Sequence, residues 1–158
     1  MTLYVDGDAF PNLLKPILCR AIDRLKLLTF VISNKPISIG KSKDINYIIV
    51  KLGADEADMK IVQMLEEGDL VITADIPLAD CVIEKKAFAI DHRGELYSRE
   101  NIKQYLAMRN LMAEIRDSGI ITKGPKPFEA KDAHQFANQL NNFLAKQSKN
   151  RRKKDEKR

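Results

Sequence analysis

The sequence predicts an α/β protein of three layers, in which helices cover both faces of a mainly parallel sheet of about five strands. Short apolar runs rich in β-branched residues alternate along the chain with segments whose apolar residues recur at helical spacing. That alternation is typical of a parallel sheet with helices packed on it. The 158 residues, of which 44% are apolar, also suffice for one domain with a sizeable core. The expected strands are residues 2–6, 27–33, 46–51, 69–73 and 87–91.

The first half of the chain supplies three of these strands and one helix. TLYVD forms the first strand, and a helix is expected from Pro11 to about Lys26. Pro11 suits a first turn, whereas Pro16 limits or bends that turn. The second strand, LLTFVIS, is followed by the polar loop NKPISIGKSK and then by the third strand, NYIIVK.

The second half of the chain alternates more regularly. A central helix is expected between Gly53, which breaks the third strand, and Gly68, which ends the helix. The fourth strand, DLVIT, and the fifth, AFAID, flank a short helix. The expected helices are residues 55–67, a segment ending at about residue 85, residues 99–117 and residues 130–144.

The net charge of +5 is unevenly distributed. Residues 146–158 contain eight basic and two acidic residues, so the rest of the chain carries a net charge of −1. We therefore expect residues 1–145 to form the α/β domain and residues 146–158 a basic, disordered tail, because the tail has too little apolar surface to fold alone. Such a tail is either an arm that binds nucleic acid or a solubilising end.

Several classes of protein are disfavoured by the sequence. No charged segment followed by a long apolar run marks a signal peptide, and no stretch approaches the ~20 apolar residues of a membrane helix. We therefore expect a cytoplasmic protein without a membrane partner.

Cys19 and Cys81 lie in apolar helical patterns without zinc-site spacing, which predicts buried, reduced thiols. The sequence indicates no oligomeric state.

Carboxylates follow two of the predicted strands. Asp6 ends the first strand, with Asp8 two residues later, and Asp75 follows the fourth strand. Asp55 and Asp58 lie three residues apart in the first turn of the central helix and so share a face. Ligands of parallel sheets bind outside the carboxyl ends of the strands. If the first and fourth strands are neighbours, these side chains converge on one edge.

Converging carboxylates repel each other unless a proton or a cation neutralises them. Mg²⁺ or Mn²⁺ takes a few carboxylates together with water and phosphate oxygens, and can generate a hydroxide that attacks a phosphodiester. The chain has only two histidines, so a histidine-based mechanism is poorly supplied. Thr73 is a candidate to support a carboxylate by a hydrogen bond. The candidate metal ligands are Asp6, Asp8, Asp55, Asp58, Asp75 and Asp80, of which Asp6, Asp58 and Asp75 are the catalytic candidates.

Three of these acids also have an ordinary structural explanation. Acids in a first helical turn complement the helix dipole, which applies to Asp55. Asp8 and Asp80 are placed where a helix or turn is capped.

Six sequence blocks resemble the YaiI/YqxD-type family of bacterial proteins. They are VDGDA with Pro11, GADEAD, GDLVITADIPLA, HRGELY, NI with Arg109 and Arg116, and GPKPF, and together they cover residues 3 to about 145. The family is similar in fold to PIN and NYN domains, whose acidic sites bind divalent metal and cut RNA. The resemblance implies that Asp6, Asp58 with Asp55, Asp75 and, more weakly, Asp80 match the PIN acids. Phe10 stands where the family often has Cys, so no thiol role is expected there.

Basic residues outside the tail are candidates to hold nucleic-acid phosphates around the acidic site. A solvated charged face is the alternative for each of them. These candidates are Arg93, Arg109, Arg116, Lys123 and Lys126.

Three functions are therefore open. The first is a metal-dependent nuclease acting on RNA or single-stranded nucleic acid. The second is a phosphatase with Asp6 as nucleophile, Asp8 as general acid and Ser33 as a phosphate contact. Ala-Phe after Asp8, where Gly-Thr is usual, and the short chain argue against it. The third is an RNA-binding module with a vestigial site, whose salt-sensitive binding needs no metal.

Overall fold

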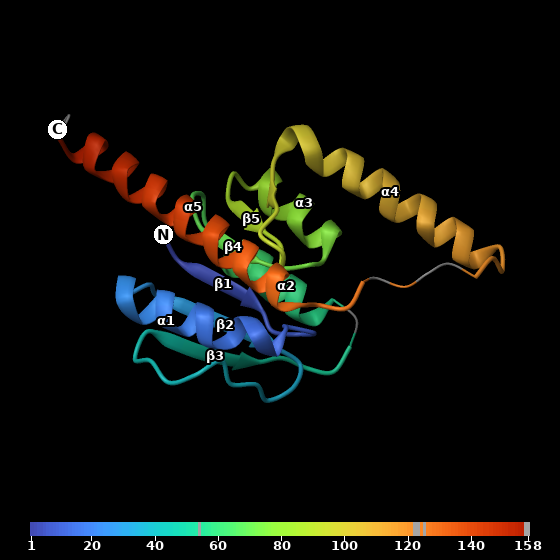
Figure 1. The fold of residues 1–158 in the computed structure, drawn as a ribbon, viewed down its shortest axis with the longest axis horizontal. Helices are drawn as coiled ribbons and strands as arrows, with labels where there is room; N and C mark the ends of the chain where they lie inside the picture. The colour runs from blue at the N-terminus through green and yellow to red at the C-terminus, as the bar shows by residue number, and fades with distance from the viewer. Residues whose placement is uncertain (54, 122–123, 125, 157–158) are drawn as a thin grey trace.

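The computed structural model describes residues 1–53, 55–121, 124 and 126–156 (Figure 1). Its helices and strands alternate in the manner that the sequence predicts. In order they are β1 (Leu3–Asp6), the short 3₁₀ helix η1 (Asn12–Leu14), α1 (Lys15–Leu25), β2 (Thr29–Ser33), β3 (Ile45–Ile49), α2 (Glu56–Met64), β4 (Leu70–Ile72), α3 (Ile76–Glu84), β5 (Phe88–Ile90), β6 (Leu96–Tyr97), α4 (Arg99–Asp117) and α5 (Ala130–Glu156).

Within the described residues the strands form one sheet in the order β3-β2-β1-β4-β5-β6. The first five strands in this order are parallel, and β6 runs antiparallel to β5. β1 pairs with β2 on one side and with β4 on the other. The strand order therefore reverses between β1 and β4, and such a reversal opens a crevice where ligands bind in α/β sheets. The first and fourth strands are thus neighbours, which is the condition under which the carboxylates converge on one edge.

Two hydrophobic cores lie on opposite faces of the sheet. Alternate residues of a strand point to opposite faces, so Val5 packs in one core and Tyr4 in the other. α1 and α5 cover the face of Val5, with Leu18 and Phe136 fully buried. α2, α3 and the start of α4 cover the face of Tyr4. The three-layer α/β class predicted from the sequence is thus the observed one.

Small differences from the predicted elements have local causes. β6 has two residues, too few for a recognisable alternation of apolar and polar side chains. α1 begins at Lys15 because Pro16 is tolerated in the first turn of an α-helix but not in its interior. α2 ends at Met64, since Leu65 is extended. α4 has the predicted bounds, and Ser98 starts it with a capping box.

Residues 146–156 of the basic C-terminal segment are helical, which corrects the prediction of a disordered tail for that part. α5 continues without a break to Glu156, and Figure 1 shows its last turns projecting from the rest of the molecule. The segment consists mostly of good helix formers and contains no Gly or Pro, so the helix anchored by buried Phe143 and Leu144 propagates outward.

The burial of the cysteines and the hydropathy of the helices bear on two further predictions. Both cysteines are free, but Cys19 is half-buried and Cys81 is exposed, so the prediction of two buried thiols is wrong. Cys81 is not among the residues of α3 that are buried in the core, and it lies on the outer side of that helix. No helix in the described part of the chain is both long enough and apolar enough to cross a membrane.

Candidate metal centre

Asp6 and Asp75 lie on either side of the crevice between β1 and β4. Asp6 is the last residue of β1 and is 8% exposed. Its Oδ2 accepts a hydrogen bond of 2.9 Å from Oγ1 of Thr73. The same Oγ1 accepts a hydrogen bond of 3.0 Å from the backbone N–H of Asp75. Fully buried Thr73 therefore fixes the carboxylate of Asp6 and the backbone of Asp75 relative to each other.

Asp75 has a structural role as well as a place in the site. It is the N-cap of α3, and its Oδ1 accepts a hydrogen bond of 3.0 Å from the N–H of Leu78. This bond satisfies one of the free N–H groups of the helix and fixes the side chain. A carboxylate held in this way loses little further side-chain freedom when it binds a ligand.

The start of α2 brings two more carboxylates to this edge, Asp58 from its first turn and Asp55 from the residue before the helix. Asp55, Asp58 and Asp75 each offer an oxygen atom, and the three atoms lie within 4.8 Å of one another. Asp58 is half-buried. Asp55 is exposed at the N-cap position of α2 and has a left-handed backbone, with φ of 67°. Asp tolerates that conformation better than most residues, but the backbone is still strained, and such strain is common at functional sites.

The carboxylates raise one another's affinity for protons. Burial, followed by the charges of Asp75 and Asp6, raises the pKa of Asp58 to about 7, and a hydrogen bond between the Asp58 and Asp75 side chains adds to the rise. Burial raises the pKa of Asp6 to about 6, although the hydrogen bond from Thr73 lowers it. The acids are therefore too close together to be fully ionised near neutral pH without a positive charge among them.

The donor set fits a hard divalent cation. All of its atoms are carboxylate oxygens, the ligands that Mg²⁺ and Mn²⁺ prefer, and no thiolate or imidazole belongs to the three-oxygen group. Burial is the main cause of the raised pKa values of Asp6 and Asp58, and a cation at this place would offset the carboxylate repulsion that adds to it. The arrangement can thus hold one such ion, with Asp6 near enough to act on it through charge.

Asp8 joins the loop after β1 to the loop after β2, and Ser33 makes a hydrogen bond within the second of these loops. Oδ1 of Asp8 accepts a hydrogen bond of 3.0 Å from the N–H of Asn34, and the hydroxyl of Ser33 donates to the carbonyl of Lys35. Gly7 allows this approach, because a Cβ there would lie 2.9 Å from the Cβ of Ser33. The groups that a phosphatase would need for a general acid and a phosphate contact are therefore occupied in the structure.

Asp80 does not join the other acids. It lies on α3, where its Oδ1 is 3.1 Å from Nζ of Lys103 of α4. The packing of α4 on α3 gives this carboxylate a cation of its own, so it needs no metal ion.

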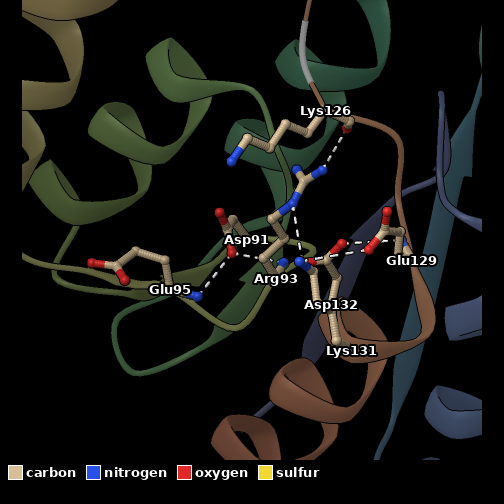
Figure 2. A network of polar contacts seen from close by, with 7 residues as sticks. All are labelled: Asp91, Arg93, Glu95, Lys126, Glu129, Lys131 and Asp132. Carbon is tan, nitrogen blue, oxygen red and sulfur yellow. Dashed lines mark hydrogen bonds and ion pairs between the residues drawn. The ribbon is translucent and has the colours of Figure 1, made fainter.

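Arg93 also makes structural contacts within the protein (Figure 2). Its Nη2 donates a hydrogen bond of 2.8 Å to the carbonyl of Lys126, and its Nε is 3.5 Å from Oδ1 of Asp132. Its guanidinium lies 5.6 Å from the ring centre of Phe128. Arg93 therefore fastens the segment before α5 to the turn after β5, and its charge is largely used there.

The other basic candidates lie on the outside of the molecule. Arg109 and Arg116 are exposed on α4, and the side chain of Lys126 is exposed. Lys123 lies outside the described residues. None of the three described side chains has an ion pair that ties it to the acidic cluster in the part of the chain that the structure describes.

The sequence reasoning missed one acid and two lysines near this edge. The acid is Asp91, which comes directly after β5, much as Asp6 comes at the end of β1. The sequence AFAID shows this placement. The Oδ1 atom of Asp91, however, already accepts hydrogen bonds from the backbone N–H groups of Arg93 and Glu95 (Figure 2). Lys15 and Lys35 line a groove of about 550 Å³ beside Asp8. No periodic pattern marks these lysines, because one lies at a helix start and the other in a loop.

Residues 4–146 match the family described as "Uncharacterized BCR, YaiI/YqxD family". The chain belongs to this family. The resemblance inferred from six sequence blocks is thereby confirmed, and the YaiI/YqxD match spans all the candidate acids.

Relatives within the family are similar over nearly their whole length. A UPF0178 protein of Sulfurimonas denitrificans is 74% identical, over 92% of this chain and 97% of the relative. UPF0178 proteins of Sulfurovum sp. and Nitratiruptor sp. are 69% and 61% identical, over 92% and 96% of this chain and 99% and 100% of their own lengths. No solved structure matches the chain.

Replacing Thr73 with Val is expected to weaken both the fold and the site. The change leaves the N–H of Asp75 without its acceptor and Asp6 without its donor, which costs about 1–3 kcal/mol of stability. Thr29→Val is the matched control, since Thr29 is equally buried and its hydroxyl bonds the carbonyl of Leu27 at the start of β2. Thermal unfolding should show a loss in both variants, but a Mn²⁺ titration should show weaker binding only in Thr73→Val. Equal Mn²⁺ affinity in the parent and both variants would contradict this role.

Proposed function

We propose that this YaiI/YqxD-family protein is a divalent-metal-dependent nuclease that hydrolyses phosphodiester bonds of RNA or single-stranded nucleic acid. The observation that carries the proposal is the convergence of the Asp55, Asp58 and Asp75 carboxylates beside Asp6. They converge at the crevice where the strand order reverses, which is the expected ligand site of such a sheet.

The chemistry follows from the oxygen-rich site. Mg²⁺ or Mn²⁺, when bound, supplies an activated water and stabilises charge on the attacking and leaving oxygens. Asp58 and Asp75 would hold the ion, with Asp55 at the rim. Asp6, fixed by Thr73, would add negative charge behind these ligands and keep the cation at the edge of the sheet.

Basic groups near the acids support a polyanionic substrate. Lys15 and Lys35 line the groove that begins at Asp8, immediately after β1. Exposed Arg109 and Arg116 on α4 and the basic end of α5 add positive charge farther away. Phosphate contacts of this kind position a nucleic acid without reading its sequence. The similarity to PIN and NYN domains that is expected from the sequence would favour RNA as the substrate.

The test is an incubation of the purified protein with 5′-labelled single-stranded RNA in Mn²⁺, in Mg²⁺ and in EDTA. The nuclease predicts cleavage with either metal and none with EDTA. Salt-sensitive RNA binding without cleavage in any of the three would favour the RNA-binding module. Formation of a covalent aspartyl-phosphate from a phosphate ester would favour the phosphatase instead.

Replacing Lys15 and Lys35 together with Gln is expected to weaken RNA binding. Because each phosphate contact contributes about 0.7 to the dependence of log K on log salt for a single strand, the slope should fall by about 1.4. The measurement is fluorescence anisotropy of labelled RNA over a salt series. The matched control is Lys43→Gln/Lys86→Gln, whose exposed lysines precede β3 and β5 at the opposite edge of the sheet. A control slope that falls as much as that of Lys15→Gln/Lys35→Gln would show that only net charge matters.

A further inference from the structure

A second groove adjoins the acidic cluster on the other side of the sheet. It has a volume of about 510 Å³ and lies between α2 and α3. One end is formed by Asp55 and Asp58, which are members of the cluster. The walls are mostly apolar and come from Met59, Val62, Pro77 and Leu78. The groove is therefore continuous with the candidate metal centre but unlike it in polarity.

The two grooves differ in the part of a nucleotide that they suit. The groove of Lys15 and Lys35 offers positive charge to phosphates. The groove of Met59 and Pro77 offers little charge beyond the two carboxylates at its end, and those repel phosphates. An uncharged, flat group attached to a phosphate would fit an apolar groove whose end would hold the cation.

We propose that the groove lined by Met59, Val62 and Pro77 binds one unpaired base of the nucleotide whose phosphate lies at the Asp58–Asp75 centre. This inference rests on the proposed function, because the bound phosphate places the base. The base packs against the side chains of Met59 and Pro77, and Gln63, which also lines the groove, supplies an amide that can bond a base edge.

The base subsite narrows the substrate class. A base in the groove must leave any base pair and stack, which a single strand permits at little cost and a duplex resists. Together with the lysine groove, the site then takes a strand that crosses the edge of the sheet from the face of α1 to the face of α2 and α3. The substrate class is single-stranded nucleic acid.

Cys81 is a built-in reporter for this subsite. Its exposed thiol lines the same groove, whereas half-buried Cys19 lies beside Gly40 on the opposite side of the sheet. The parent protein with Mn²⁺ is treated with a small maleimide, and peptide mass spectrometry measures the rate at which each thiol is alkylated. The probes are adenosine 5′-monophosphate and adenosine 3′-monophosphate, neither of which has a phosphodiester bond to cut. Ribose 5-phosphate, which lacks a base, is the matched control.

An adenosine monophosphate at two-thirds occupancy should slow alkylation of Cys81 roughly threefold and leave that of Cys19 unchanged. Ribose 5-phosphate should protect neither thiol. Met59→Ala, a change at a side chain that is 58% exposed, should reduce the protection by the nucleotide without changing Mn²⁺ affinity.

Three results would overturn the base subsite. One is that neither nucleotide changes the alkylation rate of Cys81, although the protein binds Mn²⁺ and cuts RNA. This result would leave the nuclease proposal intact. Another is equal protection by ribose 5-phosphate. Absence of both metal binding and RNA cleavage would overturn the nuclease proposal and the subsite together.

Discussion

Replacing Asp58 or Asp75 with Asn is expected to reduce metal-dependent RNA cleavage by at least ~1000-fold, because several kcal/mol of transition-state stabilisation depends on the bound ion. Both residues contribute to the three-oxygen group, and Asp75 is held by Thr73 and by the cap of α3. Asn has the shape of Asp without its charge, so the fold should persist. The measurement is the single-turnover rate with saturating enzyme and labelled RNA in Mn²⁺.

The matched control for this experiment is Asp80→Asn. Asp80 is an acid of the same helix as the Asp75 cap, but it pairs with Lys103 at 3.1 Å. Its replacement should change the rate less than ~3-fold, since a partly exposed ion pair contributes about 0–1 kcal/mol. If all three variants cut RNA as fast as the parent, the carboxylates are not the catalytic centre.

The metal-free protein is expected to lose stability as the pH rises from 5 to 8. The pKa of Asp58 is about 7 and that of Asp6 about 6 in the folded protein, against 3.8 ordinarily. The folded state thus keeps protons that the unfolded chain releases, so this stability is present below about pH 4 and is lost as the pH passes 6 to 7. With Asp58 discounted for its exposure, the loss is about 2–3 kcal/mol, or about 5–10 °C in Tm.

Mn²⁺ should reverse this loss. The ion binds the ionised carboxylates of the folded state, so it should raise the Tm at pH 8 and have little effect at pH 5. Differential scanning fluorimetry across this pH range, with and without Mn²⁺, measures both effects. Asp58→Asn should flatten the pH dependence and weaken the response to Mn²⁺. A metal effect of equal size at pH 5 and pH 8 would argue against binding at these acids.

The sequence alone predicted the parts of the site that depend on strand ends. Asp6 and Asp75 each follow an apolar strand, and parallel strands present their carboxyl ends at one edge, so their convergence required only that β1 and β4 pair. Asp58 was placed by helical spacing on the apolar side of α2. These inferences use local periodicity, which a single sequence contains.

The remainder depends on contacts between distant segments. The pairing of Asp80 with Lys103 requires α4 to pack on α3, and the engagement of Arg93 requires the start of α5 to lie beside the turn after β5. Neither contact has a local pattern. The helical end of α5 was missed because its charge was weighed above its helix propensity.

The central claim is that the carboxylates at the β1–β4 crevice are ligands of a divalent cation. Its most direct test is a titration with Mn²⁺ at pH 7.5, in which electron paramagnetic resonance measures the free ion. The parent and Asp80→Asn should bind Mn²⁺ saturably, and Asp6→Asn/Asp75→Asn should not. Saturable binding of equal affinity in all three proteins, or in none of them, would contradict the account.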